Sequence, residues 1–261
     1  MSECTHDCST CGESCSSREP QYLLKAHHPE ARVGKVYGIV SGKGGVGKSM
    51  VTSQLAVTMR RRGYQVGIMD ADITGPSIPK AFGVHGRAMG TENALIPMES
   101  GTGIQIMSIN LLLEHETDPV IWRGPVISGV VQQFWTDVLW NCDYLFVDMP
   151  PGTGDVSLSV FQSIPLDGII IVASPQDLVG MVEVPIVGLV ENMSYVACPD
   201  CGKKIYLFGE GKTAQAAAER KLPLLAEMPI DPALAALTDA GKIESFQGDW
   251  LSAAADRLEG K

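Results

Sequence analysis

Short apolar runs recur along the chain, and each ends in a loop rich in Gly, Pro, Ser or Asp. Runs of this kind are typical of buried strands. Between them lie segments whose apolar residues recur at helical spacing. The predicted strands are residues 36–41, 65–70, 104–109, 144–148, 168–173, 186–191 and 223–228. The predicted helices are residues 48–62, 125–140, 155–163, 212–221, 232–241 and 249–259.

This alternation of strands and helices predicts an α/β fold, with a mostly parallel sheet covered by helices on both faces. Residues 1–34 are polar, rich in Cys, Ser and His, and lack apolar periodicity, so we interpret them as a flexible arm before a folded domain over residues 35–261. Only twelve residues, 174–185, separate two of the predicted strands. A full helix barely fits such a short parallel crossover.

A glycine-rich turn follows the first predicted strand and opens the first predicted helix. Its sequence, GKGGVGKS, matches the phosphate loop G-x-x-x-x-G-K-[ST] at every position. The glycines allow successive backbone N–H groups to point at phosphate oxygens, and the N-terminus of the helix favours the same anion. We therefore expect a nucleoside triphosphate to bind at Gly42, Lys43, Gly44, Gly45, Val46, Gly47, Lys48 and Ser49.

Acidic residues at strand ends supply partners for a metal ion beside this loop. Asp148 ends an apolar strand, as in the Walker B arrangement, and we expect it to hold Mg²⁺ together with the Ser49 hydroxyl. Lys48 is expected to neutralise the β and γ phosphates. Asp70 and Asp72 end the strand after the first helix, and either would orient the attacking water or contact the metal, although Asp72 also fits a simple turn. This set of residues predicts hydrolysis of the nucleotide.

Two other features bear on how the loop would work. Residues 148–155, DMPPGTGD, form a stiff loop with glycine hinges, which fits a sensor of the γ-phosphate. Lys43 is a second lysine inside the phosphate loop. It is either a solvated charge or a group that reaches the nucleotide of another subunit, and its position in the sequence leaves both interpretations open.

The sequence CPDCG places two cysteines, Cys198 and Cys201, in a knuckle. Its tight turn brings two thiolates together and points backbone N–H groups at the sulfurs, as in zinc ribbons and iron–sulfur sites. Because a tetrahedral site needs four ligands, a second copy of the chain is the simplest way to complete it. A redox pair and a turn without metal are the alternatives. Cys142 stands alone before a different strand and is predicted to be a buried apolar residue.

Four more cysteines lie in the N-terminal arm, and they would suffice to hold zinc or a cluster without help. Their spacing matches no ferredoxin pattern, so a reactive tail without metal is the alternative. The chain has no basic n-region and apolar h-region of a secretory signal, and in that setting clustered cysteines favour metal over disulfides. These cysteines are Cys4, Cys8, Cys11 and Cys15.

Composition narrows the partners and the location of the protein. The net charge is −10 and the pI about 4.9, which argues against a nucleic-acid partner because such proteins carry a basic surface. No apolar stretch is long enough to span a bilayer. We therefore expect a cytoplasmic protein with no membrane partner.

Six motifs occur in an order that resembles the Mrp-type ATPases, also called ApbC. These proteins are iron–sulfur cluster carriers with a P-loop NTPase fold, related to MinD and nitrogenase iron protein, and the resemblance covers about residues 33–260. The motifs are KGGVGKS at 43–49, DADITGPS at 70–77, IWRGP at 121–125, DMPPGTGD at 148–155, SPQD at 174–177 and ENMSY…CPDCG at 191–202.

The resemblance implies an ATP-dependent carrier that acts as a homodimer. Its cofactors would be ATP, Mg²⁺ and a [4Fe–4S] cluster, and its partners iron–sulfur scaffold or donor proteins and acceptor apoproteins. The residue that matches Lys43 reaches across the dimer to the partner's phosphates, and the one that matches Asp72 is associated with water activation. Lys43, Lys48 and Asp72 are therefore the expected catalytic residues.

The resemblance also implies ligands for the base and the cluster. Asn192 and Asp231 match positions that contact adenine in relatives, and Cys198 and Cys201 match the pair that bridges a [4Fe–4S] cluster between subunits. The chain departs from the family pattern at residues 178–184, which are too few for the full helix that family members carry near the dimer face, so either this helix is lost or residues are missing from the sequence.

Two functions of other classes compete with the carrier. A MinD-like positioning ATPase would carry an amphipathic membrane helix at its C-terminus, but residues 249–261 are weakly amphipathic and not basic. The other alternative is a regulatory ATPase whose dimer is bridged by zinc.

Overall fold

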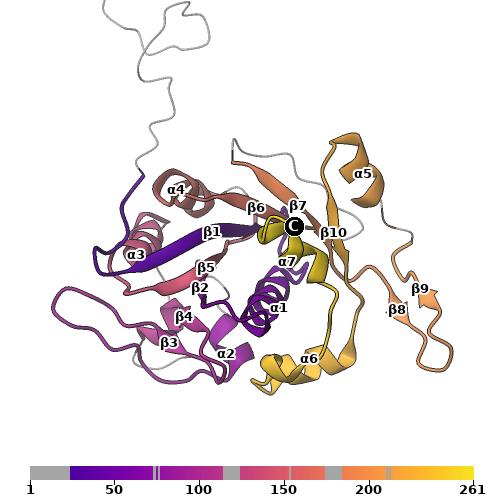
Figure 1. Ribbon diagram of the computed structural model, residues 1–261, viewed down its shortest axis with the longest axis horizontal. Coiled ribbons are helices and arrows are strands. Elements are labelled where there is room, and N and C mark those ends of the chain that lie inside the picture. Colours follow the sequence, from indigo (N-terminus) through magenta and orange to yellow (C-terminus); the bar gives the residue numbers. More distant parts are fainter. Residues whose placement is uncertain are drawn as a thin grey trace, which may run out of the picture.

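An eight-stranded sheet forms the centre of the molecule in the computed structural model (Figure 1), which describes residues 24–72, 75, 77–113, 124–152, 154–173, 184–209, 211 and 213–261. The strand order is β10-β7-β6-β1-β5-β2-β4-β3, and every pair is parallel except β3 with β4. The strands are β1 (Arg32–Val40), β2 (Val66–Asp70), β3 (Met98–Glu99), β4 (Gln105–Met107), β5 (Asn141–Asp148), β6 (Gly168–Ala173), β7 (Ile186–Glu191) and β10 (Leu224–Glu227).

Helices pack on both faces of this sheet, because successive side chains of a strand point to opposite faces. In β1, Ile39 packs in one apolar core with α1 and α7, while Val36 packs in a second core with Phe134 and Trp135 of α3. The mostly parallel α/β sheet with helices on both faces is thus confirmed. The helices are α1 (Lys48–Arg61), α2 (Ile78–Phe82), α3 (Gly124–Thr136), α4 (Asp155–Ser163), α5 (Thr213–Glu219), α6 (Pro232–Asp239) and α7 (Ser252–Leu258).

The folded unit begins before the predicted boundary at residue 35. β1 begins at Arg32, and the Trp135 indole N–H donates a hydrogen bond of 2.7 Å to the carbonyl of Lys25. The His27 ring lies edge-on to Trp135, with the ring centroids 5.5 Å apart. A buried indole needs an acceptor for its N–H, and the chain before β1 supplies it. The predicted arm over residues 1–34 is therefore too long by at least residues 24–34, and residues 1–23 lie outside the described part.

Most of the predicted strands and helices form, with slightly different ends. The structure also contains several short elements that were not predicted. α2, β3 and the hairpin of β8 (Val196–Ala197) with β9 (Lys204–Ile205) are among the elements that the hydrophobic pattern missed. A strand of only two residues is too short to show an apolar periodicity in the sequence. The hairpin projects from the body of the molecule (Figure 1) and carries the cysteine knuckle between its strands.

The short connection between β6 and β7 joins two neighbouring parallel strands. Residues 174–183 of this connection lie outside the described part, and with them the SPQD motif and the predicted loss of a helix.

The C-terminal helix α7 packs against α1. Ala254, Ala255 and Leu258 are buried in the core that α1 shares, and Arg62 at the end of α1 forms an ion pair with Asp256 at 2.6 Å. The apolar face of α7 is therefore used inside the fold. Within the described ranges, no helix has both the length and the apolar character needed to cross a membrane.

Candidate nucleotide and metal sites

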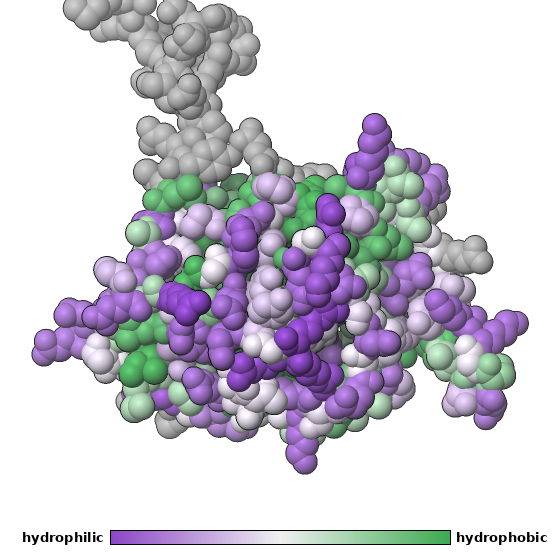
Figure 2. Space-filling model, in the orientation of Figure 1, coloured by the Kyte–Doolittle hydropathy of each residue, from purple (hydrophilic) through white to green (hydrophobic). Residues whose placement is uncertain are grey.

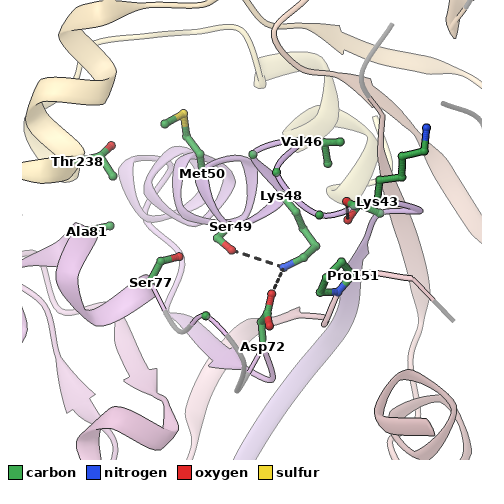
Figure 3. Close-up of a pocket in the computed structure, with 15 residues that line it drawn as sticks. Lys43, Val46, Lys48, Ser49, Met50, Asp72, Ser77, Ala81, Pro151 and Thr238 are labelled. Carbon is green, nitrogen blue, oxygen red and sulfur yellow. Dashed lines mark hydrogen bonds and ion pairs between the residues drawn. The ribbon is translucent and has the colours of Figure 1, made fainter. Parts of the chain in front are cut away.

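The glycine-rich turn lies at the carboxyl end of β1, where α1 begins. Gly45 and Gly47 take φ values of +80° and +77°, which residues with a side chain rarely adopt. A cavity of about 320 Å³ opens over the turn and is also lined by Asp72, Pro151 and Thr238 (Figure 3). The backbone thus curls beneath a cavity at the edge of the sheet where α/β proteins bind ligands.

Lys48, Ser49, Asp72 and Asp148 meet on one side of this cavity. The Lys48 ammonium lies 2.8 Å from Asp148 Oδ1 and 3.9 Å from Asp72 Oδ2, and the second contact is drawn in Figure 3. The Ser49 hydroxyl donates a hydrogen bond of 2.5 Å to Asp148 Oδ2. The carboxylates are brought together because β2 and β5 are parallel neighbours with Asp70 opposite Asp148. The structure therefore assembles these four predicted residues, with a lysine facing two carboxylates and a hydroxyl.

Two buried hydroxyls support the carboxylates, and the sequence analysis missed both. Thr52 donates a hydrogen bond of 2.7 Å to Asp148 Oδ1, and Ser108 donates one of 3.1 Å to Asp70 Oδ2. Thr52 follows Lys48 by four residues on α1, so helical spacing would have placed both on the same face. Ser108 directly follows β4, where the same sheet edge would have suggested it.

Asp70 carries a proton to higher pH than an ordinary aspartate. Its burial is the main reason that its pKa is raised well above the usual value, and the charge of neighbouring Asp148 raises it further. The ammonium of Lys48 and the hydrogen bond from Ser108 act in the opposite direction. Asp70 is therefore a buried group of the site rather than a side chain in the cavity.

The loop after Asp148 is hydrogen-bonded to Ser41, the residue between β1 and the glycine-rich turn. The Gly152 N–H donates a hydrogen bond of 2.9 Å to the Ser41 carbonyl, and the Ser157 hydroxyl donates one of 3.2 Å to the Gly152 carbonyl. Gly152 has φ of +78°, so this position uses the hinge that the sequence predicts. A change in the loop would reach Ser41 directly. Thr153 lies outside the described residues.

Three other residues are predicted to bind the nucleotide. Lys43 is among the residues that line the cavity, whereas Asn192 and Asp231 are not. Lys43 is exposed, and its ammonium points away from Lys48 (Figure 3). Asn192 is only 2% exposed and donates a hydrogen bond of 2.9 Å to the Val46 carbonyl. Asp231 caps α6, where its carboxylate accepts the N–H groups of Ala233 and Leu234. The trans contact of Lys43 and the adenine contacts of Asn192 and Asp231 stay predictions.

The β8–β9 hairpin presents the two cysteines of the knuckle at the surface. Cys201 is exposed and Cys198 partly so, and the Gly202 N–H donates to the Cys198 carbonyl at 2.8 Å. The backbone N–H groups of Asp200 and Cys201 hydrogen-bond the Cys198 sulfur and lower the pKa of its thiol. This turn therefore favours a thiolate, the form that binds metals.

The projecting lobe carries exposed apolar side chains among hydrophilic ones (Figure 2). Ile205, Leu207 and Phe208 are each about half exposed. Among the described residues, no third Cys, His, Asp or Glu joins Cys198 and Cys201 in a potential metal site.

Cys142 is buried, as predicted, and burial raises the pKa of its thiol to about 12. It is therefore an inert apolar residue of the core. Cys4, Cys8, Cys11 and Cys15 lie outside the described residues, and metal binding there stays a prediction.

Residues 32–258 match the ParA family, in the group described as NUBPL iron-transfer P-loop NTPases. The chain belongs to this family. Among its relatives, an iron-sulfur cluster carrier protein from Clostridium perfringens is 42% identical over 252 residues, which cover 89% of this chain and 87% of the relative. Another carrier of that name, from Methanococcus maripaludis, is 38% identical over 92% of this chain and 89% of its own length.

Solved structures agree with this placement among the iron-transfer P-loop NTPases. A nucleotide-binding protein from Archaeoglobus fulgidus, in complex with ADP, has a TM-score of 0.75 and 40% identity, covering 84% of this chain and 90% of its own. The cell division ATPase MinD from Pyrococcus furiosus has a TM-score of 0.55 at 20% identity, covering 87% and 99% of the two chains, which shows a shared fold alone. The resemblance to Mrp-type carriers and the P-loop NTPase fold are thus confirmed.

Proposed function

We propose that this P-loop NTPase is an ATP-dependent carrier that binds a [4Fe–4S] cluster and transfers it to acceptor apoproteins. The observation that carries the proposal is the presence, in one chain, of the Lys48–Asp148 site and a surface knuckle that stabilises a thiolate. Nucleotide binding alone needs no such thiolates, and a simple zinc or redox turn needs no phosphate loop. The relatives named iron-sulfur cluster carrier proteins support the carrier part of the proposal.

ATP would bind over the glycine-rich turn, with its phosphates on the backbone N–H groups and on Lys48. Ser49 and Asp148 fit Mg²⁺, because their oxygens are already neighbours through a hydrogen bond and hard cations prefer oxygen ligands. Lys48 would leave Asp148 for the phosphates as the cation arrives. Asp72, which lines the cavity, would then orient the water that attacks the γ-phosphate.

A homodimer would complete both sites. Lys43 is exposed at the cavity and its ammonium points away from Lys48, so it would be able to extend toward the phosphates bound by a partner subunit (Figure 3). Two copies of the knuckle would supply the four thiolates of a [4Fe–4S] cluster. Pairing the hairpins would also cover Leu207 and Phe208, whose exposed apolar surface favours association. The cluster is cargo in this scheme, received from a scaffold or donor protein and passed to an acceptor.

The test is anaerobic reconstitution of the full chain with iron and sulfide. Four proteins are compared: the parent, Cys198→Ala/Cys201→Ala, a variant with the four arm cysteines changed to Ser, and the combination. Visible absorption, iron and sulfide content, and transfer to an apo-ferredoxin are measured. We expect the arm variant to keep a transferable cluster and the combined variant to hold none. A combined variant that still binds and transfers a full cluster would overturn the proposal.

The same experiment separates the two competing functions. A parent protein that retains zinc and takes up no cluster would point to the zinc-bridged regulatory ATPase. A MinD-like positioning ATPase is disfavoured because the residues of α7 that would enter a membrane, such as Leu258, are buried against α1. Binding of the full chain with ATP to anionic vesicles would support it, and we expect no such binding.

A further inference from the structure

Asn192 fixes the orientation of one peptide unit in the glycine-rich turn. Its side-chain nitrogen donates to the Val46 carbonyl at 2.9 Å. In a trans peptide the C=O and the following N–H point in opposite directions, so this bond turns the Gly47 N–H away from Asn192. Gly47 lines the cavity above the turn. Asn192 thus orients the Gly47 N–H, a potential hydrogen-bond donor to a phosphate, without itself being exposed to the cavity.

The contact between Asn192 and the turn has little slack. A Cβ atom at Gly47 would overlap the Asn192 side-chain nitrogen and lie 3.4 Å from the terminal methyl of Met193. Met193 has φ of +58°, a conformation that costs free energy for a residue with a side chain and persists only where the surroundings hold it. A tilt of the Val46–Gly47 peptide would therefore displace Asn192 and Met193 rather than be absorbed between them.

A short segment connects Asn192 to the knuckle, because only five residues lie between Asn192 and Cys198. The Ser194 N–H donates to the Met228 carbonyl at 2.9 Å, and the Tyr195 carbonyl accepts the Ile230 N–H at 2.8 Å. β8 follows at once and pairs with β9. On the other side of Met193, the Asn192 N–H donates to the Ala173 carbonyl at 3.0 Å. Since backbone hydrogen bonds hold the segment on both sides of Met193, it is suited to move as a unit.

The side chains of the hairpin brace the same segment. The ammonium of Lys204 in β9 lies 4.2 Å from the centre of the Tyr195 ring, and Tyr206 packs against that ring with the centroids 6.2 Å apart. Further along the chain, a Cβ on Gly211 would overlap the carboxylate of buried Glu191. The chain before the hairpin thus begins at Asn192, and Gly211 beyond it packs on the neighbouring Glu191.

We propose that Asn192 is a positioning residue that couples phosphate binding at Gly47 to the geometry of the Cys198–Cys201 knuckle. A phosphate oxygen that takes the Gly47 N–H tilts the Val46–Gly47 peptide. The hydrogen bond from Asn192 transmits the tilt to the segment that ends at Cys198. The nucleotide state thereby changes how the two thiolates are presented to a metal or an acceptor. The proposal rests on nucleotide binding by the proposed carrier, but it needs no bound cluster.

The test measures thiol reactivity in the full, reduced, metal-free chain. Iodoacetamide labelling of the peptide that contains Cys198 and Cys201 is followed by mass spectrometry, with and without saturating MgATP. For the parent we expect the nucleotide to change the labelling rate about fivefold or more. For Asn192→Ala we expect nucleotide affinity to fall about tenfold, and the rate at saturation to equal the rate without nucleotide. Asn141→Ala, an exposed asparagine at the start of β5, should behave as the parent.

Asn192→Asp provides a second variant, because it keeps the volume and removes the donor, and it should reproduce the loss of coupling if Asn192→Ala does not fold. A nucleotide-dependent rate that survives in either folded variant at saturation overturns the coupling. Unchanged nucleotide affinity in both overturns the positioning of the Gly47 N–H. A parent that binds no ATP contradicts the proposed function, whereas a parent that binds ATP without any change in thiol reactivity contradicts the coupling alone.

Discussion

The ammonium of Lys48 lies 2.8 Å from a carboxylate oxygen of Asp148, so two groups expected to bind different parts of a magnesium nucleotide hold each other instead. Lys48 is 5% exposed and Asp148 is fully buried. Buried charges are stable only when they are paired, and here each neutralises the other. Arrival of the phosphates and the cation would exchange this ion pair for two new ones, so that neither charge is left alone.

Asp148→Asn is expected to separate magnesium-dependent from magnesium-free binding. The amide is a poorer Mg²⁺ ligand than the carboxylate, so ATP hydrolysis should fall by about 100-fold or more. ADP binding in the presence of EDTA should change little, because Lys48 and the backbone N–H groups remain. Steady-state hydrolysis and equilibrium dialysis measure the two quantities. Asp143→Asn in the same strand is the control, and a similar loss in both variants would contradict the assignment.

Asp70→Asn is expected to stabilise the nucleotide-free protein at neutral pH. Because the pKa of Asp70 is raised on folding, the folded state binds the proton more tightly than the unfolded state, and stability is lost as pH rises above the unfolded value of about 4. The amide removes this loss, so the free energy of unfolding should rise by on the order of 1 kcal/mol at pH 7 and not at pH 3. Urea unfolding across this range tests it, and an increment independent of pH would contradict it.

The sheet and the phosphate site were predictable because their signals are local or lie at strand ends. The short apolar runs identified every long strand, and the motif at Lys48 fixed the position of α1. The approach of Asp148 to Lys48 followed from the rule that ligands gather at the carboxyl edge of a parallel sheet.

What the sequence left unpredicted depends on contacts between distant segments. The start of the folded unit is set by a hydrogen bond from Trp135 to Lys25. The sequence of residues 24–34 has no feature that predicts a contact with Trp135. Asn192 was assigned to adenine by resemblance alone, whereas its hydrogen bond joins it to Val46, 146 residues earlier in the chain. Pairings of this range require the tertiary structure.

Cys198 and Cys142 should differ strongly in alkylation. The N–H groups that contact the Cys198 sulfur lower its pKa, so its thiolate should form below the ordinary thiol pKa of about 8.5. Cys142 is buried with a pKa of about 12 and should react only after unfolding. In metal-free protein, the rate of iodoacetamide labelling at each site is followed from pH 6 to 10 by mass spectrometry, a range of about two units around the ordinary value. A Cys198 profile no lower than that of a free thiol would contradict the knuckle geometry.

Gly47→Ala and Gly45→Ala form a matched pair within the phosphate loop. Both glycines have positive φ, so alanine costs about 1–2 kcal/mol of backbone strain at either position. At Gly45 a Cβ atom meets nothing within 4 Å, whereas at Gly47 it overlaps the Asn192 side chain. Gly47→Ala should therefore lower the free energy of unfolding further, by about another 1–3 kcal/mol, since overpacking adds to the strain. Chemical denaturation without nucleotide gives both values, and equal losses would mean that Asn192 yields freely, which contradicts the tight contact between this residue and the turn.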